Sequence, residues 1–149
     1  FLNGSIYEGS WKDDLANGAG VIRFNNGDVY EGEWMDSYAH GDGTFTSSNG
    51  LVYKGQFING FFSGSGKLIY TNNTTYEGQW NKNFANGNGT FVTRDGIIYS
   101  GTFKEGKINY SGSVTYATNQ DYTQKGELFY RHGIDMESIS LLRGELFEK

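Results

Sequence analysis

An aromatic–glycine–aromatic alternation returns at a fixed interval along the chain. It first occurs as Tyr7, Gly9 and Trp11, within the run Tyr-Glu-Gly-x-Trp. A tyrosine stands at the same place every 23 residues: Tyr7, Tyr30, Tyr53, Tyr76, Tyr99 and Tyr122. Alternation with a period of two predicts a β-strand that carries these side chains on one face. A gap-free repeat of this length predicts an array of similar structural units.

The interval divides most of the chain into a predicted repeat array, residues 1–121, followed by a different segment. The five complete units are 7–29, 30–52, 53–75, 76–98 and 99–121. Residues 1–6 match the end of a unit, so we expect the chain to begin inside a repeat and to be part of a longer protein. The register is lost in 122–149. We predict that this segment is a degenerate unit that caps the array, with dimerisation through this end as the alternative.

Each unit contains a second alternation, which begins with two glycines such as Gly18 and Gly20. We expect a loop of about six residues before it, 12–17 in the first unit. Pairs that favour tight turns close three units: Asn26-Gly27, Asn49-Gly50 and Asp95-Gly96. Such pairs accept positive φ. Each unit is thus predicted to be one β-hairpin, with glycines that leave room for the rings. The predicted fold is all-β, an elongated single-layer antiparallel sheet of stacked hairpins.

Composition and charge exclude several functional classes. The chain has no Cys, which excludes a disulfide scaffold and a Cys-based zinc site and fits a cytoplasmic protein. The formal net charge is −5, which disfavours nucleic-acid binding. The apolar runs are too short to span a membrane. His40 and His132 occupy different repeat positions, so no catalytic constellation can be assembled. We expect no enzymatic activity, cofactor or metal.

The aromatic ladder is the first candidate binding surface. Its central members are Tyr30, Trp34, Tyr53, Phe57, Tyr76 and Trp80. These rings hold neighbouring hairpins together, but a single-layer sheet cannot bury both faces. We therefore expect part of the ladder to face water or a partner, since tyrosine and tryptophan are favoured interface anchors.

A second apolar row is predicted in the loops, one residue per unit. Its members are Leu15, Tyr38, Phe61 and Phe84, flanked by Ala16, Ala39, Phe62 and Ala85. Two interpretations remain open for this row. The side chains fold inward and seal the end of each hairpin, which we favour, or they anchor a partner helix or extended peptide.

The combination of Tyr-Glu-Gly-x-Trp, a paired-glycine strand and Asn/Asp-Gly at this interval resembles the MORN (membrane occupation and recognition nexus) repeat. The resemblance covers 7–121 and, as a partial unit, 1–6. It implies an elongated array of β-hairpins that acts as a scaffold in cytoskeletal or membrane-associated assemblies. The family commonly carries a basic residue before a His-Gly pair. Here that pair survives only at His40-Gly41, and the basic position is occupied by Leu15, Tyr38, Phe61 and Phe84, with Lys107 in the fifth unit.

The favoured hypothesis is therefore a non-enzymatic scaffold that binds a helical or extended segment of another protein along the aromatic groove. Phosphoinositide or anionic-membrane binding is the runner-up, which the excess of 17 Asp and Glu over 12 Lys and Arg opposes. The third hypothesis is a targeting domain of a larger enzyme. The sequence predicts a cytoplasmic location in association with the cytoskeleton or a membrane.

Overall fold

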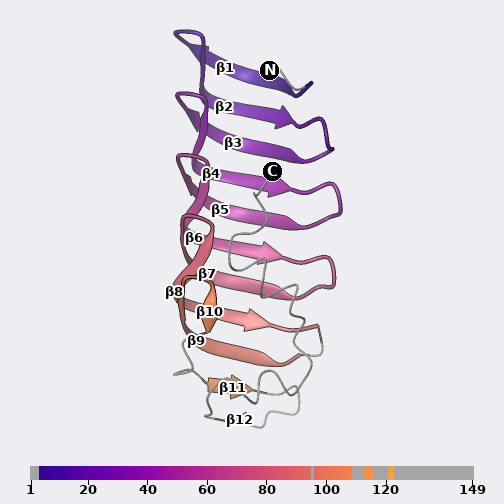
Figure 1. Cartoon of the computed structure of the whole chain (residues 1–149), viewed down its shortest axis with the longest axis vertical. Helices are drawn as coiled ribbons and strands as arrows, with labels where there is room; N and C mark the ends of the chain where they lie inside the picture. The colour runs from indigo at the N-terminus through magenta and orange to yellow at the C-terminus, as the bar shows by residue number, and fades with distance from the viewer. Residues whose placement is uncertain (1–3, 95, 109–112, 116–120, 123–149) are drawn as a thin grey trace.

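The computed structural model describes residues 4–94, 96–108, 113–115 and 121–122. Within these ranges every regular element is a β-strand, and all belong to one antiparallel sheet (Figure 1). The strands are β1 (Ile6–Lys12), β2 (Leu15–Arg23), β3 (Val29–Met35), β4 (Tyr38–Thr46), β5 (Val52–Ile58), β6 (Phe61–Ile69), β7 (Thr75–Asn81), β8 (Phe84–Val92), β9 (Ile98–Lys104), β10 (Lys107–Ile108), β11 (Ser113–Thr115) and β12 (Asp121–Tyr122). Strands β1 to β9 follow one another in space as in sequence, which confirms the predicted stack of hairpins.

The hairpin ends are tighter than the sequence predicted. The expected six-residue loop is wrong, because β1 and β2 are joined by Asp13 and Asp14 alone. Both residues have positive φ, 51° and 63°, which is the signature of a type I′ turn. The other units turn in the same way at 36–37, 59–60, 82–83 and 105–106. Type I′ turns match the twist of the flanking strands, so each strand continues to the turn.

The connections between units use a different turn. The N–H of Phe24 donates to the carbonyl of Asp28, and the N–H of Gly27 donates back to Phe24, at 2.8 and 3.0 Å. Gly27 has a φ of 95°, as the predicted Asn-Gly turn requires. The third connection replaces this glycine by Asn73, at φ 68°, which is one of the few residue types that accept this conformation. The predicted turns are therefore confirmed, since Gly27, Gly50 and Gly96 all have positive φ.

Glycines make room for the tyrosine rings, as the sequence predicted. Gly55 and Gly66 are partners across β5 and β6, and the ring of Tyr53 lies over them. A Cβ atom built on Gly66 would lie 2.2 Å from the Tyr53 hydroxyl oxygen. That hydroxyl donates a hydrogen bond to the carbonyl of Gln56 at 2.9 Å. The same arrangement recurs at Tyr7, Tyr30 and Tyr76.

The rings of adjacent units form a continuous chain of edge-on contacts. Trp80 meets Tyr53 of the preceding unit at 5.4 Å between ring centroids and Tyr76 of its own unit at 5.1 Å, both nearly perpendicular. Trp34, Phe57 and Phe103 bridge two tyrosines in the same way. Edge-to-face contacts add about 0.5–1.5 kcal/mol each beyond the area they bury. Units are therefore joined by side chains as well as by strand pairing.

Each hairpin bends, which lets a single sheet bury one face. The register shifts after the first glycine in the first four hairpins, for example between Gly55 and Phe57 in the third unit. Figure 1 shows the turn of each hairpin standing out of the strand plane along the left-hand edge. The ladder lies in the resulting corner, with Tyr53 fully buried and Phe57 only 2% exposed. Of the predicted segments, 122–149 (apart from Tyr122) and residues 1–3 lie outside the described residues, so the predicted cap and its dimerisation alternative stay predictions.

Candidate functional site: an apolar groove and its tips

An apolar pocket of about 310 Å³ lies on the aromatic side of the second and third units. Its floor is formed by side chains of the ladder and by the apolar strand residues beside them. The lining includes Ile22, Phe24, Tyr30, Trp34, Tyr38, Ala39, Phe45, Phe57 and Gly60. Its size is at the lower end of the range for small-molecule sites and suits one or two bulky apolar side chains.

The pocket is open because two repeat positions carry small residues. Ala39 stands where the next unit has Phe62, whose ring stacks on Tyr53 at 3.6 Å between centroids. Gly60 stands where the next unit has Asn83, a buried side chain. Phe62 of the third unit and Asn83 of the fourth occupy the equivalent space one unit further along. Alanine also stands at this repeat position in the first and fourth units, as Ala16 and Ala85, so Phe62 is the departure that fills the space in the third unit.

The predicted loop row lies on strands and faces outward. Tyr38, Phe61 and Phe84 each open a strand directly after the turn, and they are 57%, 41% and 37% exposed. The interpretation that these side chains fold inward is therefore wrong. Strand alternation turns the following residue inward instead, so Phe62 and Ala85 are buried and close the hairpin ends. Tyr38 also lines the pocket.

The ladder residues are buried to a greater extent than expected. All six candidates are buried, with at most 8% of any side chain exposed: Tyr30, Trp34, Tyr53, Phe57, Tyr76 and Trp80. Trp11 of the first unit, by contrast, is 55% exposed. Of the six, Tyr30, Trp34 and Phe57 line the pocket. These three are the ladder side chains that a guest in the pocket would contact.

Burial keeps the ladder tyrosines protonated. It raises the pKa of Tyr30, Tyr53 and Tyr76 well above the ordinary value, and the charges of Glu33 and Asp42 add to the effect at Tyr30. The pKa of Tyr70 is raised by burial as well. The hydroxyls of Tyr30, Tyr53 and Tyr76 therefore remain hydrogen-bond donors to backbone carbonyls into the alkaline range of pH.

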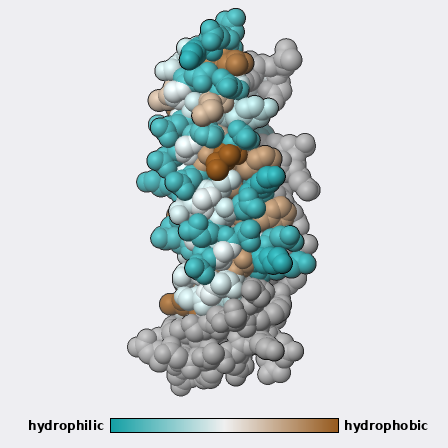
Figure 2. Space-filling view, turned by 90° about the vertical axis from the view of Figure 1, so that its left-hand side faces the viewer, coloured by the Kyte–Doolittle hydropathy of each residue, from teal (hydrophilic) through white to brown (hydrophobic). Residues whose placement is uncertain are grey.

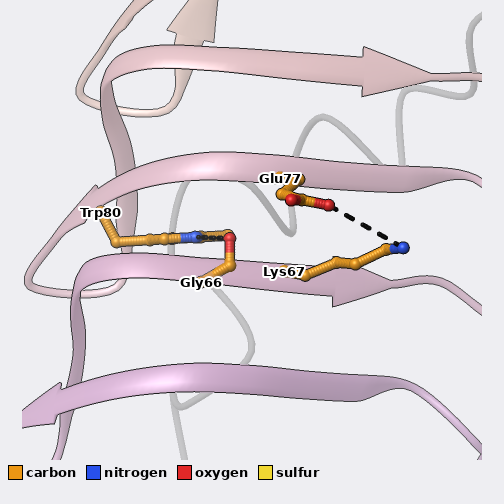
Figure 3. Close-up of polar contacts among 4 residues, drawn as sticks. All are labelled: Gly66, Lys67, Glu77 and Trp80. Atoms are coloured by element: carbon orange, nitrogen blue, oxygen red, sulfur yellow. Dashed lines mark hydrogen bonds and ion pairs between the residues drawn. The ribbon is translucent and has the colours of Figure 1, made fainter.

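Hydrogen bonds to the backbone fix two of the tryptophans. The indole Nε1 of Trp80 donates to the carbonyl of Gly66 at 3.1 Å (Figure 3). Trp34 makes the matching bond to Gly20 at 3.0 Å. Figure 3 also shows the ion pair of Lys67 and Glu77, 3.9 Å apart between two strands. Both side chains are largely exposed, so this pair adds little to stability.

The described residues offer little for catalysis or metal binding. No group of three or more His, Asp or Glu side chains among them could hold a metal ion. His40 lies in β4, where its Nδ1 atom is buried without a hydrogen-bond partner, and His132 lies outside the described residues. In the part of the chain that the structure describes, no helix is both long enough and apolar enough to cross a membrane.

The fold and the groove define a hairpin-repeat protein, a class whose extended faces serve as interaction surfaces. The MORN repeat family matches residues 7–29, 30–52, 53–75, 76–98 and 99–119. The chain therefore belongs to the MORN repeat family, a non-enzymatic repeat type whose members generally mediate protein or membrane interactions and are often membrane-associated or cytoskeletal. A search of curated proteins finds no match to this sequence.

Proposed function

We propose that the array is a non-enzymatic scaffold that holds an amphipathic segment of a partner protein along its aromatic groove. The observation that carries this proposal is the open pocket between Ala39 and Gly60. The pocket is lined almost entirely by apolar side chains, and an apolar hollow on a surface is a favoured binding position. Other MORN proteins serve cytoskeletal or membrane-associated assemblies, and we propose such a setting for this chain.

The contacts around the pocket favour a bulky apolar anchor on the partner. Trp34 and Phe57 are held by ring contacts on both sides, so the pocket is formed before a guest arrives. A preformed site avoids part of the ordering cost of binding. Tyr38 at the rim is exposed and can close over an inserted side chain with its ring and hydroxyl. One aromatic or branched aliphatic side chain of the partner would fill the space.

Phe62 interrupts the groove and limits the length over which a partner segment can lie flat along it. Because Phe62 fills the third unit, a segment that follows the groove meets a raised aromatic step one unit, about 10 Å, beyond the pocket. The proposal therefore places the strongest contact in the second unit. Weaker contacts along the other units would add to affinity by multivalency.

The test is a peptide selection followed by a matched pair of variants. A random peptide library displayed on phage is panned against the full chain, and the selected peptides are titrated by fluorescence anisotropy. Ala39→Phe introduces the side chain that the third unit already carries, and it should weaken binding at least tenfold. Asn88→Phe adds the same ring on the outer face of β8 and should leave affinity unchanged. Selected peptides that bind the Ala39→Phe variant as well as the unchanged chain would contradict the proposal.

A further inference from the structure

The five type I′ turns lie one above another along one edge of the array (Figure 1). We call this edge the tip row, in which each tip is a turn with one residue on either side: 12–15, 35–38, 58–61, 81–84 and 104–107. Each tip after the first is hydrogen-bonded to the strand residue that follows the preceding tip. The second turn residue donates its N–H to the strand of the preceding unit, as Gly60 does to Ala39 at 2.9 Å and Asn83 to Phe62 at 3.0 Å. The tip row is therefore one continuous surface and not a set of independent loops.

The tip row exposes large apolar side chains. Residues that face each other across a turn, such as Met35 with Tyr38 and Ile58 with Phe61, form exposed pairs. The exposed members are Leu15, Met35, Tyr38, Ile58, Phe61 and Phe84, between 37% and 57% accessible. Figure 2, which looks at this side of the array, shows brown apolar patches among teal polar side chains. A row of apolar side chains with a polar border is typical of an interface.

The charges of the tips change sign along the row. The first tip, with Lys12, Asp13 and Asp14, has a net charge of −1, and the second has Asp36 alone. The third tip carries no charge. The fourth has Lys82 alone, and the fifth, with two lysines and one glutamate, has a net charge of +1. The row is thus antisymmetric about the third tip, with acidic tips on one side and basic tips on the other.

We propose that two copies of this chain pair antiparallel along their tip rows, around a two-fold axis at the turn Asn59-Gly60. A two-fold axis there reverses the order of the tips in the second copy. Asp36 of each copy then faces Lys82 of the other, and the first tip faces the fifth. The apolar side chains Ile58 and Phe61 of the two copies meet at the centre.

The charge pattern and the spacing both select a second copy as the occupant. Tips recur every two strands, about 10 Å. A second copy repeats this spacing along its whole length, so all five tips can match at once. Pairing of the same two edges in a parallel sense would place Asp36 against Asp36 and Lys82 against Lys82, which like-charge repulsion disfavours. The row is narrow, so we expect the dimer to have a micromolar dissociation constant.

Charge reversal tests the antiparallel pairing directly. The full chain has a mass of 16.6 kDa, and sedimentation equilibrium should show this mass doubling as concentration rises. Asp36→Lys and Lys82→Asp should each raise the dissociation constant at least tenfold, because both of the central charge pairs become repulsive. Mixing the two variants should restore dimers, and so should both changes in one chain. The exchange suits the backbone, because Asp36 and Lys82 share a φ of 48°.

Matched controls separate this pairing from association through a different surface. Glu31→Lys makes the same charge change on the outer face, where the next unit already has Lys54, and should leave the dimer intact. Ile58→Ser, at the proposed axis, should weaken the dimer while the urea midpoint of the monomer stays unchanged. A chain that remains monomeric throughout overturns the proposal. So does a dimer that neither charge reversal weakens, that Glu31→Lys weakens equally, or that the mixture fails to restore.

Discussion

Phe62 lies flat on Tyr53, with 3.6 Å between ring centroids and 6° between ring planes. Phe57 and Trp80, by contrast, meet the same tyrosine edge-on, at 83° and 87°. Tyr53 is thereby enclosed by three rings and is fully buried. Phe62 therefore separates the open groove of the second unit from the units that follow.

Removing the stacked ring should destabilise the protein strongly. Phe62→Ala deletes a side chain that is 2% exposed and leaves a cavity beside Tyr53, so we expect a loss of about 3–5 kcal/mol of unfolding free energy. Urea titration followed by tryptophan fluorescence measures it. The neighbouring Phe61 is 41% exposed, and Phe61→Ala should cost less than about 1 kcal/mol. Equal losses for the two variants would show that Phe62 is not packed as described.

The indole hydrogen bond should account for a smaller part of the stability. Trp80→Phe keeps an edge-on ring, like Phe57 in the unit before, but removes the Nε1 donor to the Gly66 carbonyl. We expect a loss of about 1–2 kcal/mol from the unpaired carbonyl and the reduced area. Trp11→Phe, at an exposed ladder position, should change the urea midpoint little. A Trp80→Phe protein as stable as the unchanged chain would contradict this role of the bond.

The sequence predicted the stacking of the hairpins because the same local pattern recurs in each repeat. Period-two alternation, paired glycines and Asn-Gly turns agree in most units. The contacts of Gly55 and Gly66 with the Tyr53 ring confirm that the paired glycines make room for the tyrosine. The two-residue turns were missed because pairs such as Asp13-Asp14 are weak turn signals. Only Asn59-Gly60 among them resembles a favoured type I′ pair.

The site was less predictable because it depends on differences between units. The sequence drew attention to the ladder and to the row of Tyr38, Phe61 and Phe84, but it did not show which side of the hairpin end each faces. That orientation depends on the turn length, since one residue more or less reverses the face of every side chain that follows. The sequence contained one indication of the pocket: Ala39 and Gly60 are small, whereas the next unit has Phe62 and Asn83 at the same repeat positions.

A buried asparagine in the fourth tip should matter for a specific hydrogen bond. The Oδ1 atom of Asn83 accepts from the N–H of Phe62 at 2.7 Å, and both residues are buried. Asn83→Gly accepts the positive φ of 73° but removes this acceptor, so we expect a loss of about 1–3 kcal/mol. Asn73→Gly, also at positive φ and at an exposed turn where three other units have glycine, should be neutral within about 0.5 kcal/mol. Thermal and urea denaturation of both variants checks the difference.

The glycines beneath the rings should tolerate no side chain. Gly66→Ala places a methyl group 2.2 Å from the Tyr53 hydroxyl oxygen, so the ring must move and its hydrogen bond to Gln56 must lengthen. We expect a loss of about 1–3 kcal/mol from overpacking. The neighbouring Ser65 faces outward, and Ser65→Ala should have little effect. An unchanged urea midpoint for Gly66→Ala would mean that the ring does not lie over the glycine pair.

Alkaline pH should unfold the array through its buried tyrosines. In the unfolded chain tyrosine ionises with a pKa near 10, whereas burial raises the folded-state pKa of Tyr30, Tyr53, Tyr70 and Tyr76 above that value. The contribution of these groups to stability is fully present below about pH 10. Above that pH the unfolded chain releases protons that the folded chain retains, so stability falls by up to about 1.4 kcal/mol per pH unit for each tyrosine.

Urea titrations between about pH 8 and pH 11 measure this slope, and Tyr53→Phe should make it shallower by about one proton. A stability that stays level across the range, or a slope unaffected by Tyr53→Phe, would contradict the burial of these hydroxyls. Because the partners of the ladder hydroxyls are backbone carbonyls such as that of Gln56, ionisation removes a donor and leaves two acceptors facing each other. The array should therefore lose its ring contacts together with its strand pairing, in one cooperative transition.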